Sequence, residues 1–379
     1  MRNWFRSLFP TRPRGPLVVN APRAESRRGV SRISLEIDGS PLWFESSDVE
    51  LTPSTEAFAT ALATPALSAG RPLEIRGPVC SVWHQNHRRA VQLTSSWWNF
   101  PAVADPPAPP LRTATASSCS APPRGAALCF TGGVDSFFTL LRAKPTADWL
   151  VFALGYDVDL RDRRLVESAE QTVRAVAREM QKNAAVIRTN LRRHRAFRKE
   201  SWERTHGGAL GAIGHLLNGC VDLLQISSSQ TYGSSTYWGS RWDLDPLFAS
   251  STLAIQHFGA ELLRTEKLWQ IADVPLVQRH LRVCWVRHAG AGNCGRCEKC
   301  IRTMLVLETC GQLERYSSLG KRSELAARID GVESIPWGTL VAYDALRKRD
   351  MPAAVRSAVE RLLERTRLRL LAAALKQAA

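Results

Sequence analysis

The stretch Leu128-Cys129-Phe130-Thr131-Gly132-Gly133-Val134-Asp135-Ser136 joins two apolar runs through a pair of adjacent glycines. The first run, 126–130, predicts a strand, and the second, 137–141, predicts the start of a helix. Such a turn directs unpaired backbone N–H groups and the positive end of a helix dipole at one point. Glycine permits the close backbone approach and the positive φ that this turn requires. The stretch therefore predicts an anion site, above all for phosphate.

The residues next to the glycines refine this prediction. Ser136 adds a hydroxyl donor, whereas Asp135 suits an anion site only if it holds a metal ion or orients a nucleophile. The Walker pattern is excluded because no Lys-Ser/Thr pair follows the glycines. The stretch resembles the PP-loop of the ATP pyrophosphatase superfamily, Ser-Gly-Gly-x-Asp-Ser, with Thr131 in the place of the first serine. The alternative interpretation is an ordinary glycine turn between a strand and a helix.

Strand and helix patterns alternate after the linker that precedes this turn. Strands are predicted at 126–130, 149–154, 185–188 and 221–226, and helices between them at 136–143, 165–180 and 207–217. This alternation predicts an α/β fold with a doubly wound parallel sheet. Ligands of such sheets bind at the carboxyl ends of the strands. Four polar segments lie at these ends: Thr131-Gly132-Gly133, Gly155-Tyr156-Asp157, Thr189-Asn190 and Ser227-Ser228-Ser229.

The segments outside the predicted sheet complete the domain organisation. An aromatic loop follows the fourth strand at 232–248, and 253–271 is predicted as a pair of helices. We expect five parts: 1–29, basic and poorly ordered; 30–100, a small α+β domain; 101–124, a proline-rich linker; 125–310, the nucleotide-binding domain; and 311–379, a helical tail.

Four cysteines form the second chemical signal. Nine residues separate the first two members of the set, and two separate each later pair; the four are Cys284, Cys294, Cys297 and Cys300. Short Cys-x-x-Cys turns let thiolates converge on one ion, and a distant fourth cysteine closes a tetrahedron, as a structural Zn²⁺ site requires. An iron–sulfur cluster and a redox-active Cys-x-x-Cys are the alternatives. The segment 284–300 is therefore predicted to be a zinc knuckle.

The glycine turn and the four cysteines together resemble the 7-cyano-7-deazaguanine synthase family over about half of the chain, 126–309. The resemblance implies an adenine nucleotide alpha hydrolase-like fold. It also implies that the enzyme converts ATP to AMP and pyrophosphate, activating a carboxylate as an adenylate for amide or nitrile formation. The stretch that reads the deazapurine in that family is not visible here, so the acceptor stays open.

Residue roles follow from the same resemblance. Phosphates would contact Thr131, Gly132, Gly133, Asp135 and Ser136, and adenine would lie at Leu154, Gly155 and Tyr156. Lys267 corresponds to a lysine that faces phosphate, and the cysteines correspond to the zinc ligands. Asp135, Ser136 and Lys267 are the expected catalytic residues. Asp135 is also expected to be one of the ligands of a Mg²⁺ ion.

The net charge of +16 favours an anionic partner. The segment 188–204 is rich in arginine and could bind RNA phosphates or a polyanionic substrate. A solvated basic surface explains the same charge, and RNA is not the favoured partner. The expected partners are ATP and a small or protein-borne carboxylate; a homodimer is compatible with the sequence. A tRNA-modifying enzyme and a non-catalytic nucleotide-binding module are the alternative functions. No apolar run is long enough to span a bilayer, so we expect a cytoplasmic protein without a membrane partner.

Overall fold

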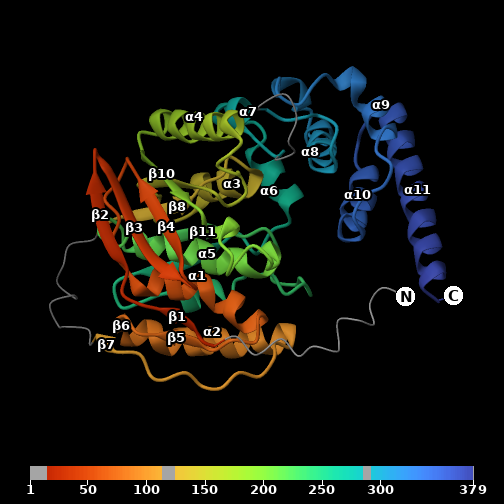
Figure 1. Ribbon diagram of the computed structural model, residues 1–379. Coiled ribbons are helices and arrows are strands. Elements are labelled where there is room, and N and C mark those ends of the chain that lie inside the picture. Colours follow the sequence, from red (N-terminus) through yellow and green to blue (C-terminus); the bar gives the residue numbers. More distant parts are fainter. Residues whose placement is uncertain (1–14, 113–123, 285–291, 379) are drawn as a thin grey trace.

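The computed structural model describes residues 15–112, 124–284 and 292–378. An eight-stranded sheet runs through the molecule, and helices lie on both of its faces (Figure 1). The strands follow one another across the sheet in the order β12-β11-β8-β9-β10-β4-β3-β2. The chain is therefore an α/β protein built on one mixed sheet.

Five neighbouring strands of this sheet are parallel. Their side chains alternate between two cores: Leu150 and Phe152 enter one, and Val151 enters the other. Burial on both faces explains the continuous apolar runs in the sequence. The parallel strands are β8 (Ala126–Cys129), β9 (Trp149–Leu154), β10 (Asn183–Thr189), β11 (Leu223–Ser227) and β12 (Ala254–Phe258).

Each face of the sheet has its own set of helices. One core receives residues from α3 (Val134–Arg142), α4 (Arg163–Glu179), α6 (Arg264–Ile271), α7 (Pro275–His280) and α8 (Glu298–Thr309). The other core receives residues from α1 (Thr55–Ser68), α2 (Ser81–Trp98) and α5 (Trp202–Leu216). Glycines let α5 approach α1 closely, because a Cβ on Gly208 would lie 2.6 Å from the carbonyl oxygen of Thr60.

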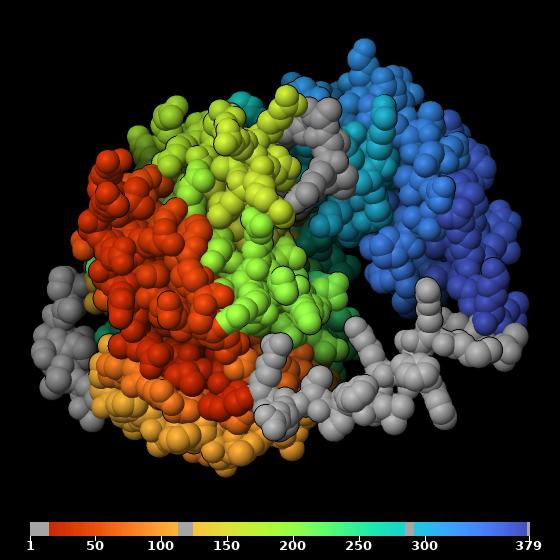
Figure 2. All heavy atoms as spheres, viewed as in Figure 1, coloured from red at the N-terminus to blue at the C-terminus, as the bar shows by residue number. Residues whose placement is uncertain are grey.

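The sequence predicts a doubly wound parallel sheet, whereas the observed sheet is mixed, because the five parallel strands are extended by three antiparallel ones. These are β2 (Arg23–Arg27), β3 (Val30–Ile37) and β4 (Ser40–Ser46), and β4 pairs with the end of β10. The region 30–100 thus shares its sheet with the parallel strands. The physical reason is that β10 would otherwise present an open edge, with unpaired backbone groups beside an apolar face. In the space-filling view the red to orange N-terminal segments lie directly against the green ones (Figure 2).

The prediction of poor order before residue 30 is wrong for the part that the structure describes. Leu17 and Val19 are buried, and their strand β1 (Leu17–Val19) pairs with β5 (Leu73–Ile75). The predicted linker also contains a strand, β7 (Leu111–Arg112), which pairs with β6 (Val79–Cys80). Residues 1–14 and 113–123, which complete these two predicted segments, lie outside the described residues.

The predicted helix pair at 253–271 is also partly wrong. Its first third forms strand β12, which pairs in parallel with β11, and only 264–271 is helical, as α6. Ile255 is buried, and Gly259 turns the chain with a φ of +89°. Pairing at the sheet edge therefore overrides a helical preference that five residues alone cannot sustain.

The C-terminal region is helical, as expected for the tail. It contains α9 (Leu325–Asp330), α10 (Leu340–Arg347) and α11 (Ala353–Ala378), whose buried residues join the first core. Single 3₁₀ turns occupy Leu191–Arg193, Asp245–Phe248, Leu313–Arg315, Arg322–Glu324 and Trp337–Thr339. Within the described residues, none of the helices has the length and apolarity that crossing a membrane requires.

Replacing Phe44 by Ala tests whether β4 belongs to the core of the parallel strands. The ring of Phe44 is fully buried and packs edge-to-face on Phe58, with the ring centroids 5.5 Å apart. We expect Phe44→Ala to lower the free energy of unfolding by about 3–5 kcal/mol in a denaturant titration followed by tryptophan fluorescence. Glu36→Ala, at an exposed position of the neighbouring strand, is the control and changes little. A loss below about 1 kcal/mol for Phe44→Ala would contradict the shared core.

Candidate functional site

The glycine turn lies between the end of β8 and the first residue of α3. Gly132 has a φ of +73°, which favours glycine, and Gly133 precedes the helix as its N-cap. The Ser136 hydroxyl donates to the carbonyl oxygen of Gly133 (3.0 Å) and lies 3.5 Å from the Thr131 hydroxyl. The two hydroxyls and the N-terminus of α3 are therefore gathered at one point.

Asp135 is held by two cations from α6. Arg264 donates from Nε (2.9 Å) and Nη2 (2.6 Å) to Oδ2, and the Nζ of Lys267 lies 3.4 Å from Oδ1. Lys267 also donates to the carbonyl oxygen of Ser228, just beyond β11 (2.6 Å). The structure thus brings the predicted residues Asp135 and Lys267 together across 132 positions of sequence.

The partners of Asp135 also decide its chemistry. Because Lys267 is 1% exposed, burial lowers its pKa, and the nearby charge of Asp135 opposes this shift. The carboxylate of Asp135 raises the pKa of Arg264. Both oxygens of Asp135 face cations, so this arrangement does not fit the predicted role of Asp135 as a Mg²⁺ ligand. Sequence reasoning missed Arg264, whose signal is its place one turn before Lys267 on the same helix.

A basic cavity of about 120 Å³ opens beside the turn. Among the described residues that line it, four are basic and Asp135 is the only carboxylate. The basic residues come from α6, from the segment after α7, and from α8; they are Arg264, Arg282, Lys299 and Arg302. Arg282 is also joined to the turn, since its backbone N–H donates to the carbonyl oxygen of Gly132 (2.8 Å). This surplus of positive charge suits a phosphate group.

An aromatic cavity of about 220 Å³ lies on the other side of the turn. It shares three lining residues with the basic cavity: Thr131, Gly133 and Asp135. Its walls include Phe152 of β9 and Tyr156 after it, and Trp202 of α5. The two cavities therefore meet at the glycine turn, one suited to phosphate and the other to a flat or apolar group.

The residues expected at adenine divide into two groups. Tyr156 lines the aromatic cavity, and its buried hydroxyl donates to the carbonyl oxygen of Ala209 (2.6 Å). Leu154 is fully buried and does not line either cavity. Gly155 has a φ of +96°, and a Cβ there would lie 1.9 Å from the carbonyl oxygen of Thr189. Gly155 is thus required by the packing of two strands.

Sequence reasoning named several polar residues of the aromatic cavity, Ser227 among them, but it did not find the hydrogen-bond network around Asp245. The Ser227 hydroxyl lies in its lining and has no hydrogen-bond partner in the described part of the chain. Beside it, the buried carboxylate of Asp245 accepts from the Ser240 hydroxyl (2.7 Å) and lies 2.7 Å from Nδ1 of His257. Burial lowers the pKa of His206, another lining residue, which favours the neutral form of its ring. No periodicity or spacing marks this set, because its members come from separate loops and helices.

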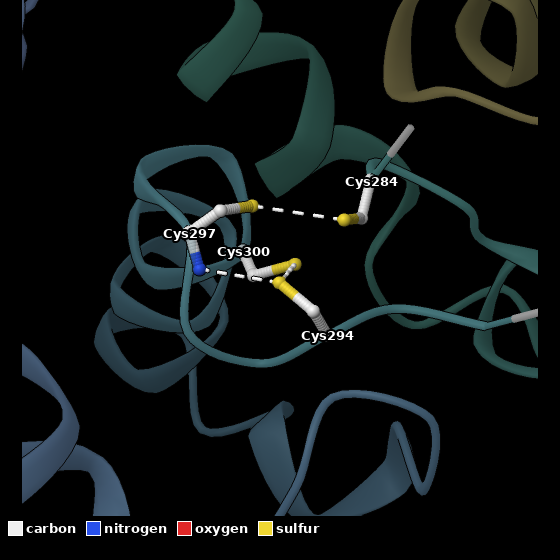
Figure 3. Close-up of side chains that lie close together, drawn as sticks. All are labelled: Cys284, Cys294, Cys297 and Cys300. Atoms are coloured by element: carbon white, nitrogen blue, oxygen red, sulfur yellow. Dashed lines mark hydrogen bonds between the residues drawn. The ribbon is translucent and has the colours of Figure 1, made fainter. Parts of the chain in front are cut away.

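The four predicted cysteines form one cluster, shown in Figure 3. All four sulfur atoms lie within 4.8 Å of one another. The backbone N–H of Cys297 donates to the sulfur of Cys294 (3.2 Å), as expected for a knuckle turn. Gly295 completes that turn with a φ of +64°. Four thiols at this separation fit a tetrahedral metal such as Zn²⁺, and a full set of protein ligands leaves no position for a substrate.

The cysteine cluster also positions the basic cavity. Cys284 lies two residues after Arg282, and α8 begins directly after Cys297 with Lys299 and Arg302 on its first turns. A metal bound there would fix both segments relative to the glycine turn. Its role would be structural, because the cysteines themselves do not line either cavity.

Changing one cysteine tests the metal assignment. We expect Cys297→Ser to lose most of the bound zinc, measured by elemental analysis, and to lower the melting temperature, because the remaining thiols lose a fourth ligand. The control Cys310→Ser, which changes a cysteine outside the cluster, should keep both properties. One zinc ion per chain in Cys297→Ser would contradict the assignment.

A comparison of the chain with models of protein families, with curated proteins and with solved structures found no match. The functional argument therefore depends on the geometry of the two cavities, the glycine turn and the cysteine cluster.

Proposed function

We propose that this chain is an ATP-dependent ligase of the PP-loop type, with a doubly wound nucleotide-binding core. It adenylates a carboxylate, releases pyrophosphate, and passes the activated acyl group to a nitrogen nucleophile. The carrying observation is Asp135, which lines both the basic and the aromatic cavity and is held there by Arg264 and by the buried Lys267. An adenine nucleotide has the same division, with phosphates at one end and a planar ring at the other.

The charge distribution supports one orientation of ATP in the proposed site. The phosphates occupy the glycine turn and the basic cavity, where Arg264, Arg282 and Arg302 face them. The adenosine occupies the aromatic cavity, beside Tyr156 and the unpartnered Ser227 hydroxyl. The α-phosphorus then lies near the turn itself, which both cavities share.

The chain's own groups account for the first chemical step. An acceptor carboxylate is already ionised at neutral pH, so its attack on the α-phosphorus needs no general base. Negative charge grows on the departing pyrophosphate as the bond to the α-phosphorus breaks. Lys267, Arg264 and the N-terminus of α3 stabilise that charge in a partly dehydrated site. Asp135 holds both cations in position.

The adenylate then reacts with a nitrogen nucleophile. The nitrogen attacks the acyl carbon, AMP leaves with the electron pair of the acyl–phosphate bond, and the proton that the nitrogen loses passes to solvent. A tRNA-modifying enzyme would use the same first step on an RNA base, and a nucleotide-binding module would bind ATP without turnover. The products distinguish these functions. The ligase would form AMP with small carboxylates, the tRNA-modifying enzyme would form AMP only with RNA, and the nucleotide-binding module would form no AMP.

A product assay with a charge-neutral variant tests the proposal. We expect purified protein to form AMP and pyrophosphate from ATP with at least one member of a panel of small carboxylates. Asp135→Asn should lower that rate by about 100-fold or more, because Arg264 and Lys267 lose the carboxylate that positions them. Asp273→Asn, at an exposed site after α6, is the matched control and keeps the rate. Formation of ADP, or an unchanged rate in Asp135→Asn, would overturn the proposed role.

The pKa of Lys267 predicts the alkaline side of the pH profile. Only protonated Lys267 stabilises the departing pyrophosphate, and burial lowers its pKa. The rate of AMP formation should therefore fall as pH rises, and the fall should begin at a lower pH than an exposed lysine would give. The arginine in Lys267→Arg stays charged, so the remaining rate of AMP formation in this variant should stay constant to a higher pH than in the unchanged protein. An identical alkaline limb in both proteins would exclude Lys267 as its cause.

A further inference from the structure

Aromatic rings gather on the surface beside the aromatic cavity, from two distant parts of the chain. Trp97 and Trp98 end α2, and the loop 232–242 contributes Tyr237 and Trp242. The rings of Trp97 and Tyr237 are stacked, with centroids 5.1 Å apart. We call these four residues and Tyr232, which packs on Trp242, the aromatic patch.

The aromatic patch is open to solvent on its loop side. Tyr232, Tyr237 and Trp242 are 54%, 48% and 39% exposed. Loop residues of this size normally bury their rings, and single exposed rings need no explanation. Three neighbouring exposed rings, of which Tyr237 stacks on the end of α2, form a surface on which planar groups can stack.

Arginines are interleaved with these rings. The guanidinium of Arg241 lies 5.3–5.6 Å from the ring centroids of Trp97, Tyr237 and Trp242, and Asp243 pairs with it. Arg204 lies over Trp98 at 5.7 Å and forms no ion pair within the described residues. Arg204 therefore gives the patch a positive charge that no carboxylate in the described part of the chain neutralises.

A basin of cations lies in the segment that precedes α5. Arg195, Arg198 and Lys199 line an open basin of about 660 Å³. These three cations have no ion-pair partner in the described part of the chain. Asp38, the carboxylate among the described lining residues, accepts from both terminal nitrogens of Arg71 (2.7 and 2.8 Å). The basin is accordingly a site of strong positive potential.

One segment connects the basin with the aromatic patch. Arg192 lies over the ring of Trp202 at 4.5 Å, and Trp202 lines the aromatic cavity. Arg204 follows Trp202 by two positions on α5 and reaches Trp98. Cations and rings therefore follow one another from the basin residues 195–199 through Arg192 and Trp202, which lines the aromatic cavity, to Arg204 and Trp98 of the patch.

We infer that this track binds single-stranded RNA. Unpaired bases stack on exposed rings and on guanidinium planes, and phosphates between them pair with arginine and lysine. A duplex would hide the base faces that the rings need. The exposed hydroxyl groups of Tyr232, Ser235, Thr236 and Tyr237 stand among the rings as partners for the ribose 2′-hydroxyl. This inference does not depend on ATP turnover, because none of the patch residues lines the basic cavity.

Binding of a labelled RNA to the full chain tests the inference. The probe is a fluorescein-labelled single-stranded ribo-oligonucleotide of about 12 nucleotides and mixed sequence, followed by anisotropy from about 50 to about 200 mM salt. We expect binding, and Tyr237→Ala should weaken it about 5-fold or more, whereas Tyr237→Phe keeps the ring and the affinity. Trp242→Ala is a second variant in case the first disturbs the loop.

Paired charge variants separate the track from the net charge of the chain. Arg198→Gln with Lys199→Gln should reduce the salt slope by about 1.4, as expected for two lost phosphate contacts. The control Arg27→Gln with Arg28→Gln removes the same charge at the far end of the β2–β3 hairpin and should leave the slope unchanged. Equal effects of the two pairs, equal affinity for the matching DNA or an RNA duplex, or no binding would overturn the inference. The rate of AMP formation is measured in Tyr237→Ala as well. Loss of RNA binding with an unchanged rate would show that the RNA track and the proposed ligase activity are separate.

Discussion

The ammonium group of Lys267 is buried almost completely, and such a charge needs a neutralising partner close by. Asp135 is that partner, and Arg264 shares it. The three side chains tie the first turn of α3 to α6, and the bond from Lys267 to Ser228 ties both to the end of β11. The positions of the glycine turn and of the cavities on each side of it depend on this arrangement.

The four-cysteine cluster acts on the same site from the other side. Arg282 contacts the turn through its backbone, and its neighbour Cys284 belongs to the cluster. Asn293 strengthens the link, since its side chain accepts from the backbone N–H of Val283 (2.9 Å) and donates to the carbonyl oxygen of Leu281 (2.9 Å). A bound metal would therefore preserve the basic cavity without entering it.

The antiparallel strands and the helices on their side give the aromatic cavity its surroundings. Phe44 and Phe58 belong to the same core as Tyr156 and Ile213, both of which line that cavity. The end of α2 supplies Trp97 and Trp98 to the surface beside it. The N-terminal region thus shapes one half of the candidate site, although its sequence carries no chemical motif.

The sequence determined the features that local patterns encode. Adjacent glycines between two apolar runs specified the turn after β8, alternating apolar runs specified β9 and β11, and Cys-x-x-Cys spacing specified the cysteine cluster. Only the tertiary structure decided the mixed sheet, the strand at 254–258, the partnership of Arg264 with Asp135, and the network around Asp245. Each of these depends on contacts between residues far apart in the chain, and no periodicity or spacing records which distant segment will cover an open strand edge or neutralise a buried charge.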